Sequence, residues 1–92
     1  MREVARARLT PTQWLVLARM AAGDDNAAIG RVLGIRPGTV ASHIKVIYQR
    51  LPPAIQGNKR AAAATWYLTV GRALYEREAR GAIPRHMMRG LP

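Results

Sequence analysis

The residues best suited to recognition chemistry lie in one segment, residues 37–51. Helical periodicity there places five small or polar residues on the outward side of the helix: Gly38, Ala41, Ser42, Lys45 and Gln49. The lysine could donate to a guanine edge or a phosphate, the serine can donate or accept, and the alanine offers a methyl group to thymine. The segment therefore favours a helix that reads nucleic acid.

Catalysis has almost no support in the residue types. The chain has two histidines, no cysteine and only five acidic residues. These residues form no nucleophile–base pair and no metal-ligand cluster in the sequence, and the absence of cysteine excludes disulfides and thiolate sites. We therefore expect no catalytic residues, no metal site and no cofactor, and we predict that the protein is not an enzyme.

The charge of the chain points to a polyanionic partner. Fifteen Lys and Arg residues oppose five acidic ones, giving a formal net charge of +10, and thirteen of the fifteen are Arg. The guanidinium group of arginine is well shaped for phosphate. Two alternatives stay open, namely a generally basic soluble surface and an Arg-rich composition inherited from a GC-rich genome.

Length and composition predict one small helical domain. With 92 residues, 49% of them apolar and none of them Phe, the chain favours small side chains between closely packed helices. Apolar runs such as residues 15–18 are too short for a membrane span, and no signal peptide is visible, so we expect a cytoplasmic protein with no membrane partner. We divide the chain into a basic arm (1–8), one helical domain (9–81) and a basic tail (82–92).

Residues that typically start or stop helices predict the bounds of the first two helices. Thr10 and Pro11 are typical of a helix start, and the helix that they begin should stop at Gly23. After a polar turn, Asn26 can cap a second helix of about two turns, which Gly34 should end.

Two further helices follow. The third should run from Pro37 to Leu51, with an inward stripe formed by Val40, Ile44, Ile47 and Leu51. The fourth should run from about Lys59 to Arg80, with Ala63, Tyr67, Val70 and Leu74 on one stripe and Trp66 beside it.

The segment NAAIGRVLGIRPGTVASHIK, residues 26–45, fits a helix-turn-helix. Gly30 lies where the two helices should cross most closely, and Gly34 lies at the turn, where a left-handed backbone costs glycine least. The apolar residues at the right offsets to fill the wedge between the helices are Ile29, Leu33, Ile35 and Val40.

From Leu9 to about Arg72 the chain resembles the DNA-binding domain of LuxR/GerE-type bacterial regulators. The resemblance is carried by Leu9-Thr10-Pro11, Val16-Leu17, Gly23, Asn26, Ile29, Leu33-Gly34-Ile35, Thr39-Val40, His43-Ile44 and Leu51. It implies an all-α fold of four helices, here with an extended fourth helix, in which the third reads the major groove and the fourth pairs two subunits on an inverted repeat. Residues 9–81 would then form a helix-turn-helix DNA-binding domain with a C-terminal dimerisation helix. The base-reading positions of the family match Ala41, Ser42 and Lys45.

Several residues depart from the family pattern. Gln13 replaces an acid, Ala27-Ala28 replaces Lys-Glu, and Ala41 replaces a basic residue, while Arg36 and Arg60 stand where Ser or Thr caps are usual. We therefore expect two caps to be missing and the domain to be less stable alone. Family members usually carry a receiver or ligand-binding domain ahead of this module, and only eight residues precede Leu9, so we expect a stand-alone module without phosphorylation or autoinducer control.

Together these observations predict sequence-specific binding of double-stranded DNA by a homodimeric transcription regulator. The predicted base readers are Ala41, Ser42, Lys45 and Gln49. The predicted backbone contacts are Arg31, Arg36, Thr39, His43, Arg50, Lys59 and Arg60. The predicted dimerisation residues are Ala63, Trp66, Tyr67, Val70 and Leu74.

Three other functions stay open from the sequence. Helix four could capture another regulator or a polymerase subunit, with DNA binding weak or vestigial. The same helix-turn-helix could serve a phage packaging or recombination factor that regulates no promoter. Sigma-factor region four shares much of the pattern, although the long fourth helix argues against it.

Overall fold

The computed structural model describes residues 9–51, 58–78, 80–88 and 91, and these residues contain helices and no strand. The elements are α1 (Pro11–Ala21), α2 (Asn26–Leu33), α3 (Pro37–Arg50), α4 (Lys59–Trp66), the π-helix η2 (Tyr67–Gly71), α5 (Arg72–Glu78), and the 3-10 helices η3 (Arg80–Ala82) and η4 (Arg85–Met88). The predicted all-helical fold is confirmed. The predicted basic arm and the residues after Leu51, 52–57, lie outside the described residues. Within the described part of the chain, no helix is both long and apolar enough to cross a membrane.

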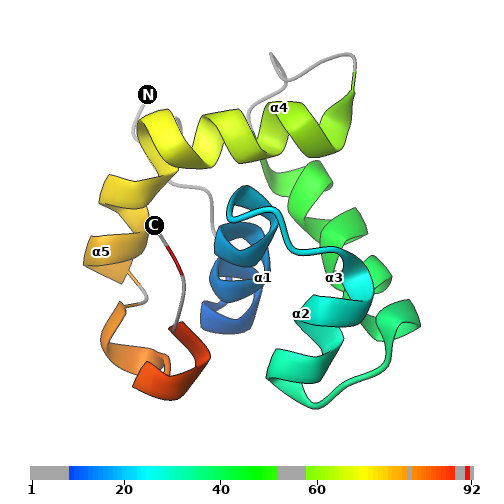
Figure 1. Ribbon diagram of the computed structural model, residues 1–92. Coiled ribbons are helices and arrows are strands. Elements are labelled where there is room, and N and C mark those ends of the chain that lie inside the picture. The colour runs from blue at the N-terminus through cyan, green and yellow to red at the C-terminus, as the bar shows by residue number, and fades with distance from the viewer. Residues whose placement is uncertain (1–8, 52–57, 79, 89–90, 92) are drawn as a thin grey trace.

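Helix α1 is the centre of the fold, between α4 on one side and the α2–α3 pair on the other (Figure 1). Its start is fixed by a capping box: the Gln13 N–H donates to Thr10 Oγ1 over 3.2 Å, and the Thr10 N–H donates to Gln13 Oε1 over 3.0 Å. The glutamine that replaces a family acid therefore still caps the helix. The buried residues of α1 are Gln13, Trp14, Leu15, Val16, Leu17, Ala18 and Met20.

The predicted fourth helix is present but bent. It runs as α4, then η2, then α5, and Figure 1 shows α5 turning away from the direction of α4. A π-helix inserts an extra residue into the turn, which commonly bends a helix. The predicted extended fourth helix is therefore confirmed in length, with helical residues from Lys59 to Glu78, but it is bent rather than straight.

Aromatic packing accompanies this bend. The rings of Trp14 and Trp66 stack with centroids 6.2 Å apart, and Tyr67 and Tyr75 lie 6.4 and 6.3 Å from the Trp14 ring. A Cβ atom on Gly71 would lie only 2.7 Å from Cζ3 of Trp66. Gly71 therefore lets the Trp66 ring lie against the bend, and the four rings join α1 to both halves of the bent helix.

The C-terminal segment also belongs to the packed domain. Ile83, predicted to lie in a basic tail, is buried, and Met87 and Leu91 pack against the core. The Arg19 Nη1 donates to the carbonyl oxygen of Met87 over 3.4 Å. Residues 83, 87 and 91 thus pack against the core rather than extending away from it.

Candidate nucleic-acid interface

The turn between α2 and α3 has the geometry predicted for a helix-turn-helix. Gly34 ends α2 in the left-handed region with φ of 73°, and its N–H donates to the Gly30 carbonyl oxygen over 2.8 Å. The Ile35 N–H donates to the same oxygen over 3.0 Å. A Cβ atom on Gly30 would lie 2.5 Å from the Ile35 carbonyl oxygen, so the backbone does approach closely at Gly30, although the nearest atoms belong to the turn before α3.

We expect Gly30→Ala to destabilise the domain by about 1–3 kcal/mol, because backbone atoms must move to admit the methyl group. Gly38→Ala is the matched control, since nothing lies within 4 Å of a Cβ atom there. That change should be neutral or stabilising by up to about 1 kcal/mol, because alanine loses less entropy in a helix. Urea unfolding of both variants measures the difference, and equal stabilities would contradict the close packing at Gly30.

Helix α3 has one buried and one exposed side, as its periodicity predicts. The buried side consists of Val40, Ile44, Ile47 and the following Leu51. The exposed side carries Gly38, Ala41, Ser42, Lys45 and Gln49. The structure therefore brings all four predicted base readers onto one solvent-facing surface, which we call the reading face.

Short side chains occupy the N-terminal half of the reading face. Gly38 has open space where a Cβ atom would be, and Ala41 ends at its methyl group. The Ser42 hydroxyl donates to the Gly38 carbonyl oxygen over 3.2 Å. Lys45 and Gln49 supply the longer polar side chains one and two turns further along.

The predicted backbone-contacting residues divide into two groups. Arg31, Arg36, Thr39, Arg50 and Lys59 are exposed. His43 and Arg60 are partly buried. Arg60 binds the protein itself: its Nη1 donates to Asn26 Oδ1 over 2.9 Å, and its Nη2 donates to the Asp24 carbonyl oxygen over 2.9 Å.

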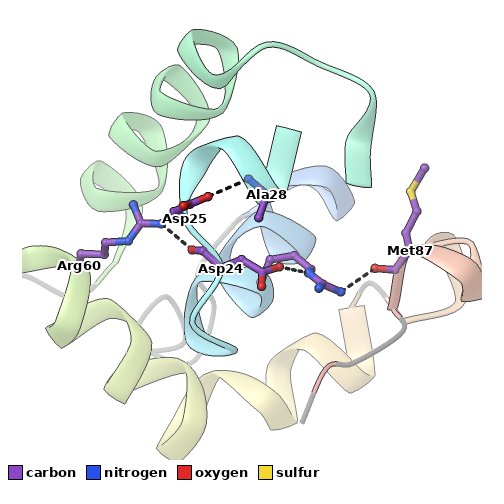
Figure 2. A network of polar contacts seen from close by, with 6 residues as sticks. Asp24, Asp25, Ala28, Arg60 and Met87 are labelled. Atoms are coloured by element: carbon purple, nitrogen blue, oxygen red, sulfur yellow. Dashed lines mark hydrogen bonds and ion pairs between the residues drawn. The ribbon is translucent and has the colours of Figure 1, made fainter. Parts of the chain in front are cut away.

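Arg60 is part of a polar network that surrounds the turn between α1 and α2 (Figure 2). The backbone of Asp24 accepts from Arg60, and its carboxylate pairs with Arg19 Nε at 2.6 Å. Arg19 in turn reaches the carbonyl oxygen of Met87. The network therefore ties α4 and the C-terminal segment to the start of α2. Sequence reasoning missed it, since its members lie far apart along the chain.

Two predicted caps differ in the structure. Asp25, not Asn26, caps α2, because Asp25 Oδ1 accepts from the Ala28 N–H over 2.8 Å while Asn26 is already helical. Asn58 caps α4 by accepting from the Ala61 N–H, so the cap thought to be lost at Arg60 is present two residues earlier. Only the expected absence at Arg36 is confirmed, since its side chain makes no capping bond to α3.

The predicted dimerisation residues do not share one surface. Ala63, Tyr67 and Leu74 are buried within the single chain, and Trp66 is partly buried. Val70 is exposed. The π-turn explains this split, because the extra residue moves Gly71 to the buried side and turns Val70 outward.

Two tyrosines among the described residues have shifted pKa values. Burial raises the pKa of Tyr67 to about 12, with a smaller contribution from Tyr75. Burial also raises the pKa of Tyr48, while Arg60 acts in the opposite direction. No group of three His, Cys, Asp or Glu residues within the described part of the chain could hold a metal ion.

Comparison with known proteins places this helix-turn-helix in a family. Residues 7–54 match the luxR family of bacterial regulatory proteins, also called GerE. Over 43 residues the chain is 44% identical to a protein of Escherichia coli (strain K12) named as an HTH-type transcriptional regulator, YhjB. The matched segment makes up 47% of this chain and 22% of that relative. The chain thus spans about a fifth of that relative's length. No solved structure matches. Because the family match includes more than half of the residues, the chain belongs to the LuxR family of bacterial regulatory proteins.

Proposed function

We propose that the protein is a transcription regulator that binds double-stranded DNA sequence-specifically as a homodimer, with α3 in the major groove. The observation that carries the proposal is the reading face, a solvent-exposed set of small and polar side chains on a helix braced by a helix-turn-helix. The major groove admits an α-helix, and polar side chains there can distinguish all four base pairs. Ala41, Ser42, Lys45 and Gln49 are its base readers.

Cations around the reading face are proposed to hold the phosphate backbone. Arg31 lies on α2, Arg36 directly precedes α3 and Arg50 ends it, and Lys59 begins α4; all four are exposed. Such contacts fix the register of a protein on the duplex without reading sequence. Thr39 and His43, on α3, are proposed to add hydrogen bonds to the same backbone.

The proposed dimer contact is at the bend of the fourth helix. Leu68 and Val70, both in η2, are the exposed large hydrophobic residues of the described chain, at 43% and 52% exposure. Figure 1 shows this bend on the other side of α1 from α2 and α3. Pairing there would leave both reading faces free. A two-fold pair would place two α3 helices about one DNA turn, ~34 Å, apart.

Selection of bound duplexes from a random DNA pool by the purified protein tests this function. We expect enrichment of an inverted repeat whose half-sites are centred about 10 base pairs apart. A pool that is not enriched would overturn sequence-specific binding. Enrichment of a single half-site would retain DNA binding and overturn the homodimer.

A second candidate function is the capture of another regulator or a polymerase subunit through the fourth helix. The exposure of Leu68 and Val70 favours it as well, because an apolar surface can meet a different protein. This function predicts a chain that is monomeric in sedimentation and enriches no duplex. Both outcomes together would favour it over DNA recognition.

The neighbouring cations Lys59 and Arg60 should respond differently to substitution. Lys59→Ala should reduce the slope of log affinity against log salt by about 0.9, the value for one lost phosphate contact. Arg60→Ala should leave that slope unchanged and lower the free energy of unfolding by about 1–3 kcal/mol, because its hydrogen bonds join α4 to the α1–α2 turn. Binding titrations at several salt concentrations and urea unfolding measure both quantities. A slope that falls in Arg60→Ala as much as in Lys59→Ala would contradict the structural role of Arg60.

A further inference from the structure

The Ser42 hydroxyl has its hydrogen directed into the helix. It donates to the Gly38 carbonyl oxygen one turn earlier, at 3.2 Å, while the serine itself is exposed. A hydroxyl has one hydrogen and two acceptor lone pairs. While the hydrogen is used by the backbone, the hydroxyl presents its acceptor lone pairs to solvent. The Ser42 oxygen is therefore placed to accept a hydrogen bond from a donor group on the DNA.

The neighbouring residues allow this short side chain to reach a base. Gly38 leaves open space beside the helix, and Ala41 extends no further than its methyl group. Longer side chains at these positions would hold α3 further from the groove floor. Ala41 can itself make only an apolar contact, and the apolar group in the major groove is the 5-methyl group of thymine.

Where Ser42 and Ala41 contact the same base pair, these two requirements select that pair. Adenine and cytosine both present an amino donor in the major groove, whereas guanine presents only acceptors there. Only the A·T pair combines an amino donor with a methyl group. Building on the function proposed above, we propose that Ser42 accepts from the N6 amino group of adenine while Ala41 contacts a thymine methyl group, so that the N-terminal half of α3 reads an A·T pair.

Lys45, three residues further along α3, is placed to contact a neighbouring base pair. Three residues of helix rise by ~4.5 Å, which is between one and two base-pair steps of ~3.4 Å. Lys45 can only donate, and guanine offers it two acceptors, O6 and N7. The half-site should therefore contain a guanine within about two base pairs of the A·T pair that faces Ser42.

The first test compares the duplexes selected by the wild type and by Ser42→Ala. Alanine is the better helix former, so the variant should fold, and circular dichroism checks this. The variant should lose discrimination at one position of each half-site, and that position should be an A·T pair in the wild-type selection. If the wild type selects a G·C pair at that position, or if the variant still binds with unchanged discrimination, the contact between Ser42 and adenine is overturned while the proposed function stands. A wild type that enriches no duplex would overturn both the assignment and the proposed function.

The second test removes the adenine amino group itself, by placing unsubstituted purine at that position. Wild-type affinity should fall by about fivefold, the loss of one hydrogen bond, whereas Ser42→Ala should fall by no more than ~1.5-fold because its contact is already absent. Thr12→Ala, which removes an exposed hydroxyl on α1, is the control and should respond as the wild type does. Equal losses in the wild type and Ser42→Ala would overturn the adenine contact.

Discussion

Affinity for the selected duplex should fall by about 10³-fold to 10⁵-fold when the salt concentration rises from about 50 to 200 mM. The chain carries a net charge of +10, and the exposed cations include Arg31 on α2, Arg36 and Arg50 at the two ends of α3, and Lys59 at the start of α4. If each of two protomers places these four side chains on phosphates, the number of phosphate contacts falls within the range of about six to ten for which such a loss is expected. The physical cause is that binding releases counterions from the DNA. The entropy gained by this release is smaller when the salt concentration in solution is higher.

Fluorescence anisotropy with a labelled duplex, at fixed pH and increasing salt, gives this slope directly. Arg31→Gln and Arg36→Gln should each make the slope shallower by about 0.9 without changing the preferred sequence. Arg77→Gln, an exposed arginine on α5, is the matched control and should leave the slope unchanged. A flat salt response would show that phosphate contacts do not contribute, and would remove the electrostatic argument for DNA as the partner.

The helix-turn-helix could be predicted closely from the sequence because its signals are local. Pro37 marks the first turn of α3, and the spacing from Val40 to Leu51 identifies the buried side without any knowledge of the partner helices. Gly30 and Gly34 were equally readable, because one is required by a close backbone approach and the other by a positive φ. The exposed reading face follows from the same periodicity.

The fourth helix could not be predicted in the same way, because its course depends on distant contacts. The bend at η2 places Trp66, Tyr67 and Tyr75 around Trp14, a residue some fifty positions earlier in the chain. A regular helical period therefore assigned Val70 to the buried stripe. Gly71 was the only local sign of an irregularity, and a glycine within a helix permits several outcomes.

Arg60 shows a similar limit for charged residues. Its type and position near a helix start favour phosphate, yet its guanidinium binds Asn26 and Asp24, which are 34 and 36 residues away. An arginine can satisfy its donors with DNA or with the protein, and only the three-dimensional placement decides which. The caps at Asp25 and Asn58 differ from expectation by one and two residues, because several adjacent polar side chains could each have capped those helices.

Opposite results are expected for glutamate at two neighbouring positions of the fourth helix. Leu74 is 5% exposed and faces the core, so Leu74→Glu should lower the free energy of unfolding by about 3 kcal/mol or more through lost packing and a buried carboxylate. Val70 is 52% exposed, so Val70→Glu should change the stability of the single chain by no more than about 0.5 kcal/mol. Thermal unfolding followed by circular dichroism separates the two. A folded Leu74→Glu variant with wild-type stability would contradict the burial of Leu74.

Val70→Glu should nevertheless change the assembly, because a two-fold contact brings the same residue from both protomers to one interface. Two carboxylates would then face an apolar surface that contains Leu68, which is unfavourable for both desolvation and repulsion. We expect sedimentation to show a dimer for the wild type at micromolar concentration and a folded monomer for Val70→Glu. The monomer should bind the inverted repeat much more weakly than the wild type, with affinity near that for an isolated half-site. Thr12→Glu adds the same charge to an exposed position of α1 and should remain dimeric. A wild type that is monomeric, or a Val70→Glu variant that stays dimeric with full affinity for the repeat, would remove the bend of the fourth helix as the dimer contact.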